Sequence, residues 1–300
     1  LHEAIPVLKA LAESNPQFSN EIRKPERPKV EAVDPDEVKL PPDLHPDLGA
    51  PSQIWPYRDA ENRLVFYVYR FDKDGKKETR PLAWSAAKNE WRWQFPEGLF
   101  PIYQLQHLLI RPEALVIITE GEKAADAAAV QFPDAVVITS ACGSDQALRT
   151  DWTLLKGRQV VVAPDKDAPG KHYALAVAGA AFANGATTVK VVDVWQLGDW
   201  DAGDDLADHQ VTPEFVSGAV DILSLFEATE LEPCIVHAAA LLGRGDLDRC
   251  KKKLAETLGI GVRAFEGLVK EARTKEQQEG DFSATEQGFE EDKVDPWEET

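Results

Sequence analysis

The chain has 300 residues, of which 43% are hydrophobic, and its 52 acidic and 33 basic side chains give a formal net charge of −19. This length allows one large or two modest domains, and the hydrophobic fraction is enough for a folded core. The acidic balance argues against a protein that grips duplex nucleic acid through a broad basic face. Three cysteines without a CxxC pair exclude a zinc ribbon and a disulfide framework, which fits a reducing cytoplasm.

The first 51 residues predict a helix followed by a linker. Apolar residues recur with helical spacing over residues 2–13, and residues 23–51 are rich in proline and charge, as in extended linkers. The chain begins at Leu1 and contains no methionine, from which we expect a piece of a longer polypeptide. No hydrophobic run approaches the roughly 20 residues that cross a membrane as a helix, so we expect no membrane partner.

Residues 52–108 predict a small β-rich module. A strand over 64–71, a turn over 72–77 and a returning strand over 80–84 indicate an antiparallel hairpin, which Trp91 and Trp93 continue. The aromatic side chains of this module are suited to stacking on bases, but packing in the core of a small sheet is the favoured interpretation.

Residues 109–226 predict an α/β domain. Strand-like apolar runs alternate with helical patterns, which is typical of a parallel sheet flanked by helices. The predicted strands are 115–119, 135–139, 159–163 and 188–194, and the predicted helices are 123–130, 145–155 and 173–184. Residues 227–275 predict a helical connector, and residues 276–300 predict an acidic disordered tail with a net charge of −9.

Acidic residues follow three of these strands. Glu120 follows the first, Asp165 and Asp167 follow the third, and Asp201 or Asp204 follows the fourth. Because parallel sheets place their sites at the carboxyl ends of strands, we expect the carboxylates to converge there. Two carboxylates about 4 Å apart repel by roughly 4 kcal/mol at an effective dielectric near 20, so the cluster predicts a bound cation, with Mg²⁺ the natural candidate.

Two alternatives stay open for these acids. Asp167 stands just ahead of a predicted helix and is also suited to a helix N-cap, and Glu120 alone would suit a solvated charge. The position of the last acid is ambiguous because five aspartates crowd into ten residues: Asp199, Asp201, Asp204, Asp205 and Asp208.

Three segments together resemble the Toprim domain, which occurs in primases, topoisomerases and some nucleases. They are residues 117–126 (IITEGEKAAD), 163–170 (APDKDAPG) and 201–204 (DAGD), and the likeness is nearest to phage- and plasmid-type primase–helicase proteins. The resemblance implies that Glu120 is a general acid or base. It further implies that Asp165 and Asp167, with Asp201 or Asp204, bind Mg²⁺ or Mn²⁺, and Glu120 is also a candidate metal ligand.

The resemblance also implies an activity and its partners. The expected function is a primase-like nucleotidyltransferase that makes short primers on single-stranded DNA from nucleoside triphosphates, in phage, plasmid or mobile-element replication. Lys123 is a candidate for phosphate binding, because it lies in the first turn of a predicted helix where backbone amides also favour anions. Lys171, beside the Asp165–Asp167 loop, is a weaker candidate. A helicase-type ATPase is the expected protein partner. The alternatives are a metal-dependent nuclease and a non-catalytic docking module for a helicase.

Overall fold

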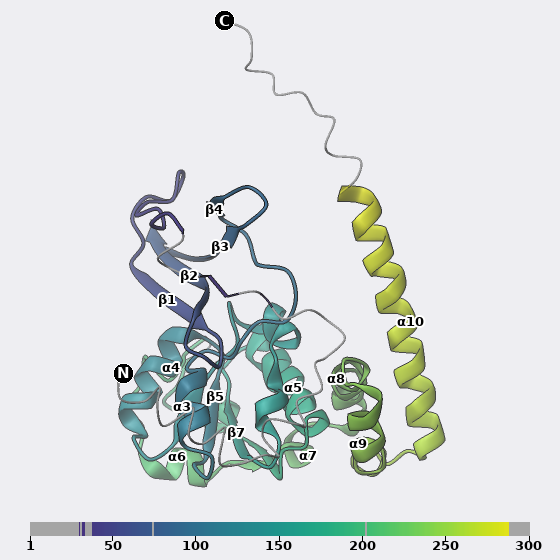
Figure 1. The fold of residues 1–300 in the computed structure, drawn as a ribbon. Coiled ribbons are helices and arrows are strands. Elements are labelled where there is room, and N and C mark those ends of the chain that lie inside the picture. Colours follow the sequence, from purple (N-terminus) through teal and green to yellow (C-terminus); the bar gives the residue numbers. More distant parts are fainter. Residues whose placement is uncertain (1–29, 31, 34–37, 74, 202, 288–300) are drawn as a thin grey trace, which may run out of the picture.

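Two β-sheets organise the chain in this computed structural model, which describes residues 30, 32–33, 38–73, 75–201 and 203–287. The first is antiparallel, in the order β1-β2-β3-β4, and the second has the order β6-β5-β7-β8-β9, parallel except where β8 meets β9. Figure 1 shows the four-stranded sheet above the five-stranded one. The strands are β1 (Gln53–Arg58), β2 (Leu64–Lys73), β3 (Lys76–Ser85), β4 (Glu90–Arg92), β5 (Val116–Thr119), β6 (Val136–Ile138), β7 (Gln159–Ala163), β8 (Thr188–Val191) and β9 (Val220–Asp221).

Helices cover both faces of the five-stranded sheet, which confirms the predicted α/β class. Val116 and Ile118 of β5 face a core shared with α3, α5 and α8, while Ile117 faces a second core shared with α4. This alternation explains why β5 is apolar at every position. The helices around the sheet are α3 (Leu105–Ile110), α4 (Glu122–Gln131), α5 (Ala168–Ala183), α6 (Pro213–Ser217) and α7 (Ile222–Leu225).

The predicted helix over 145–155 is wrong. The segment forms two short 3₁₀ helices, η1 (Ser144–Arg149) and η2 (Trp152–Leu155). Between them the chain is extended and bridges Phe100, whose amide donates to Arg149 O at 2.7 Å and whose carbonyl accepts from Asp151 N at 2.8 Å. A backbone that is paired in this way cannot also continue a helix. The strand predicted over 188–194 likewise ends early, at Val191, and η3 (Val194–Gln196) follows.

The four-stranded sheet packs through one face onto the α/β domain. Trp55 and Val68 are register partners, and both lie in the core shared with α4. On the opposite face Tyr69 and Phe71 are buried against the half-buried Trp93. Aromatic rings therefore fill the space on both sides of β2, as the packing interpretation predicts.

The segment before β1 is not the extended linker that the sequence predicts. Trp91 Nε1 donates to Lys39 O at 2.6 Å. The His45 ring contacts the Trp93 ring in a tilted arrangement, with centroids 4.6 Å apart. Val33 N also donates to Leu64 O at 2.6 Å. His45 and Leu48 therefore pack on the aromatic face of the sheet, whereas Leu40 and Leu44 are exposed. The helix predicted over 2–13 lies outside the described residues.

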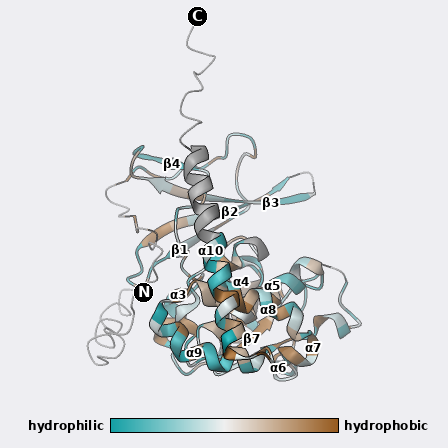
Figure 2. Cartoon of the chain, turned by 90° about the vertical axis from the view of Figure 1, so that its right-hand side faces the viewer, coloured by the Kyte–Doolittle hydropathy of each residue, from teal (hydrophilic) through white to brown (hydrophobic). Residues whose placement is uncertain are grey.

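Three helices form the carboxyl-terminal part: α8 (Ala228–Ala240), α9 (Arg244–Thr257) and α10 (Val262–Gln287). In Figure 2, teal and brown alternate along the lower part of α10, as expected of a helix with one packed face. The helix continues to Gln287, beyond the predicted start of disorder at Glu276. Extending an existing helix avoids the cost of nucleation, which explains the difference. Among the described residues, no helix has both the length and the apolar character to cross a membrane.

Candidate active site

The predicted acids lie at the topological switch point of the five-stranded sheet. The chain passes from β5 outward to β6 and then returns to β7 on the other side of β5. Crevices at such points, beyond the carboxyl ends of strands, are where open α/β sheets bind ligands. Thr119 and Ala163 are register partners at the ends of β5 and β7. Glu120 follows Thr119 directly and Asp165 follows Ala163 after Pro164, so both acids lie just beyond the same edge of the sheet.

Glu120 is buried and incompletely satisfied. Its side chain is only 9% exposed, and its Oε2 atom is buried without a hydrogen-bond partner. Burial and the neighbouring charge of Asp167 raise the pKa of Glu120 to about 7, although the backbone amide of Asp165 partly stabilises the carboxylate. Tyr173 of α5 holds the end of β5 just before it, donating to Thr119 O at 2.6 Å.

Asp165 and Asp167 enter the site from the loop after β7. Burial and the charge of Glu120 raise the pKa of Asp165 to about 8, and the charge of Asp167 adds to the effect. Asp167 is also the N-cap of α5, because its Oδ1 accepts from Gly170 N at 2.7 Å. The N-cap role of Asp167 is thus compatible with its predicted role as a metal ligand. Gly170 is required here, since a Cβ would lie 2.1 Å from Asp165 O.

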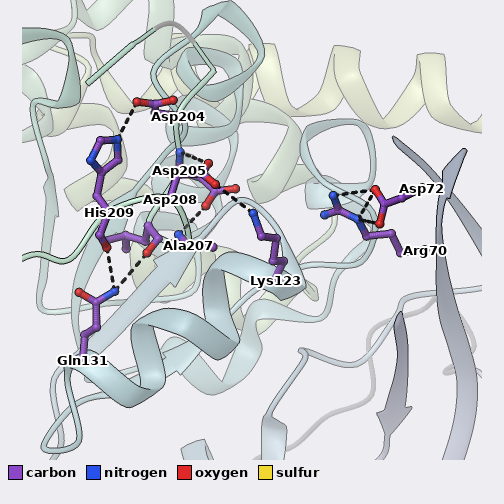
Figure 3. A network of polar contacts seen from close by, with 10 residues as sticks. Arg70, Asp72, Lys123, Gln131, Asp204, Asp205, Ala207, Asp208 and His209 are labelled. Carbon is purple, nitrogen blue, oxygen red and sulfur yellow. Dashed lines mark hydrogen bonds and ion pairs between the residues drawn. The ribbon is translucent and has the colours of Figure 1, made fainter. Parts of the chain in front are cut away.

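Among the crowded aspartates, Asp205 is the one whose charge acts on both Glu120 and Asp165, and the expected role of Asp201 or Asp204 stays a prediction. Asp204 Oδ2 contacts His209 Nε2 at 2.6 Å (Figure 3). It also accepts from Asp201 N at 2.7 Å. Asp201 is exposed. The charge of Asp205, by contrast, raises the pKa of both Glu120 and Asp165.

The two lysines predicted to bind phosphate are both engaged in ion pairs. Lys123 Nζ lies 3.1 Å from Asp208 Oδ1, as Figure 3 shows, and Lys171 Nζ lies 2.7 Å from Glu230 Oε1. The cation whose charge acts on the acids belongs to the antiparallel hairpin and is not among the predicted site residues. Lys77 of β3 lowers the pKa of both Glu120 and Asp165.

The strand register explains the position of Lys77. Lys77 and Thr79 are two residues apart on β3 and point to the same face. Thr79 reaches the thiol of Cys142, in the loop that follows β6, and lowers its pKa, although burial raises that pKa overall to about 12. Because residues two apart on a strand share a face, the position of Thr79 near Cys142 indicates that Lys77 also faces the α/β domain.

The donor set fits a hard divalent cation. Every acid in it supplies carboxylate oxygen, and the unpartnered Oε2 of Glu120 is an acceptor that the protein leaves unused. Within the described part of the chain, no group of three or more His, Cys, Asp or Glu side chains is already gathered tightly enough to hold a metal ion. Mg²⁺ usually needs only one or two carboxylates, because substrate phosphates and water complete its coordination.

Comparison with known proteins gives a likeness of fold. No protein-family model matches the chain, and no curated protein matches it. A DNA primase domain from Pseudomonas aeruginosa is 15% identical, with 76% of each chain covered and a TM-score of 0.44. The E. coli primase catalytic core is 14% identical, with 69% of this chain and 70% of that chain covered and a TM-score of 0.37. The zinc-binding and RNA polymerase domains of Aquifex aeolicus primase are 15% identical, with 71% and 53% covered and a TM-score of 0.41.

Proposed function

We propose that this chain is a metal-dependent nucleotidyltransferase of the primase type, which joins nucleoside triphosphates into short primers on single-stranded DNA. The observation that carries the proposal is the buried, unpartnered Oε2 of Glu120 beside Asp165 at the switch point of the sheet. The resemblance of the three acidic segments to the Toprim domain supports the same chemistry. Replication of a phage, plasmid or mobile element and a helicase partner stay predictions from that resemblance.

Each acid has a role in this proposal. Asp165, Asp167 and Asp205 would hold Mg²⁺ or Mn²⁺, which would offset the triphosphate charge and lower the pKa of the attacking 3′-hydroxyl. Glu120 accepts the proton of that hydroxyl. Its pKa of about 7 suits this task, because a general base works best when its pKa lies near the operating pH.

We assign Lys77 of β3 to the site as its phosphate-binding cation. Its side chain is exposed, and its charge acts on both Glu120 and Asp165. An ammonium group in this position is suited to contact a phosphate that bridges to the metal. Lys123 and Lys171 are less suited, because binding a phosphate would first require breaking their ion pairs with Asp208 and Glu230.

The test is incubation of the chain with end-labelled single-stranded DNA, nucleoside triphosphates that carry a second label, and Mg²⁺. We expect short new products that disappear in Asp165→Asn. The matched control is Asp134→Asn, an exposed aspartate ahead of β6 at the amino end of the sheet, which should retain activity. Shortening of the labelled DNA would instead identify a nuclease. If no new primer appears and the labelled DNA is not shortened, the result favours a docking module and overturns the proposal.

A further inference from the structure

Lys166, between Asp165 and Asp167, joins two acidic segments of the site through its backbone. Lys166 N donates to Asp204 O at 3.1 Å, and Lys166 O accepts from Gly203 N at 3.1 Å. This two-way exchange resembles the pairing of two strands, although neither segment is part of a sheet. The loop that carries Asp204 and Asp205 is thereby held in register with the Asp165–Asp167 loop.

The side chain of Lys166 adds a second connection to the same loop. Its Nζ donates to Leu197 O and to Trp200 O, each at 2.6 Å. Bonds from an ammonium group are short and strong, and two carbonyl acceptors fix its direction. The ammonium group is therefore bonded to backbone carbonyls of the loop that follows η3. A phosphate-binding lysine would instead present its ammonium group to the ligand.

The same loop also contacts α4 and is bonded within itself: Gln131 Nε2 donates to Leu206 O and to His209 O, each at 3.1 Å, and Lys123 pairs with Asp208. Trp200 is 5% exposed and stacks on the His209 ring, with centroids 4.5 Å apart. His209 in turn contacts Asp204. These contacts hold the loop together and against α4. The bonds of Lys166 are those that tie it directly to the Asp165–Asp167 loop.

We propose that Lys166 is a positioning residue for the divalent cation site. Its ammonium group and backbone hold the loop that carries Asp205 beside the Asp165–Asp167 loop, so that the carboxylates are in place before a metal binds. This inference rests on the proposed function, because it assigns Lys166 to the metal site proposed there. Lys166 touches neither metal nor substrate in this role.

The test compares Lys166→Met, which keeps the length of the side chain and removes its donors, with the wild-type chain. Mn²⁺ binding is followed by electron paramagnetic resonance, without nucleotide or DNA. Loss of a group that orients a metal ligand typically weakens metal binding by about 10- to 100-fold, and we expect a change in this range. Lys166→Arg, which retains donors for both carbonyls, should restore most of the affinity. Lys190→Met on β8, where the lysine is exposed, is the matched control and should bind as wild type.

A second measurement needs no metal. In hydrogen–deuterium exchange, the peptide that contains Trp200 and Asp204 should exchange faster in Lys166→Met, whereas β5 and β7 should be unchanged. If Lys166→Met fails to melt cooperatively, Lys166→Gln, which keeps one donor, replaces it in both measurements.

The outcomes separate the two proposals. A wild-type chain that binds no Mn²⁺ overturns the proposed function and this inference with it. A normal wild-type titration, together with unchanged binding and unchanged exchange in Lys166→Met, overturns the role of Lys166 alone. Faster exchange with weakened binding supports both.

Discussion

Glu120 and Glu122 lie two residues apart, both are buried, and the protein surrounds them differently. Glu122 is 3% exposed and accepts from Tyr57 Oη at 2.7 Å and from Cys142 N at 3.3 Å. Glu120 is 9% exposed and leaves Oε2 without a partner. Burial raises the pKa of both. Glu122 receives a side-chain donor and a backbone donor that offset the cost, whereas Glu120 receives only the backbone amide of Asp165. Glu122 is therefore suited to hold the fold, and Glu120 to accept a proton or a ligand.

The same contrast extends to the regions around the two residues. In the seam between the four-stranded sheet and α4, Asp126 accepts from Trp55 Nε1 at 2.8 Å and from Tyr103 Oη at 2.9 Å. At the switch point, by contrast, Asp165 lies among like charges that raise its pKa. Polar groups in the seam are paired, and those at the switch point are left in mutual repulsion. Variants that separate stability from activity can test this difference.

The largest expected effect is on activity, from Glu120→Gln. The substitution removes the proton acceptor while keeping the shape of the side chain, so primer synthesis should fall by about 10²- to 10⁴-fold. Thermal stability should be unchanged or higher, because the charge next to Asp165 and Asp167 is gone. Glu113→Gln, at an exposed glutamate ahead of β5, is the control for both measurements. Activity near the wild-type level would assign Glu120 no role in the reaction.

A smaller effect, on stability, is expected from Tyr57→Phe. Glu122 would lose its side-chain donor in a buried place, which costs about 1–3 kcal/mol of unfolding free energy. The melting temperature should fall by roughly 2–8 °C, while Mn²⁺ affinity stays at the wild-type value. Tyr67→Phe, on the opposite face of the same sheet, is the matched control. If Tyr57→Phe melted like wild type while Mn²⁺ binding weakened, the assignment of stability to the seam and of metal binding to the switch point would be wrong.

Local patterns in the sequence predicted the parts of the site that depend on single strands. Continuous apolar runs placed Glu120, Asp165 and Asp167 just beyond strand ends, and the parallel sheet then brought them together. The identity of the third acid could not be predicted in this way. Asp204 and Asp205 lie in a loop without periodicity, and its register depends on backbone bonds to Lys166 and on the His209 contact.

Long-range pairs explain the other differences. The partners of Lys123 and Lys171 lie 85 and 59 residues away in the sequence, so the position of each lysine near a helix start could not reveal that it is paired. The 3₁₀ segments over Ser144–Leu155 have the same cause, because Phe100 bridges the chain between them. Propensity decides local structure only where no distant backbone competes for the same hydrogen bonds.

The smallest effect, and the one that unites the two regions, concerns pH. Glu120 and Asp165 have pKa values of about 7 and 8 in the folded chain, well above the ordinary values near 4 of the unfolded chain. The folded state therefore binds more protons between these limits. The stability associated with these groups is fully present below about pH 4 and is lost as pH rises through 7 and 8.

The metal-free melting temperature should thus fall by a few degrees between pH 5.5 and 8.5, and Mg²⁺ should restore it most at pH 8.5, where both carboxylates are charged. Asp165→Asn should flatten both trends, and the difference between the two chains cancels the contribution of histidines. A metal-free melting temperature that rises over this range, relative to Asp165→Asn, would contradict the repulsion that distinguishes the switch point from the seam.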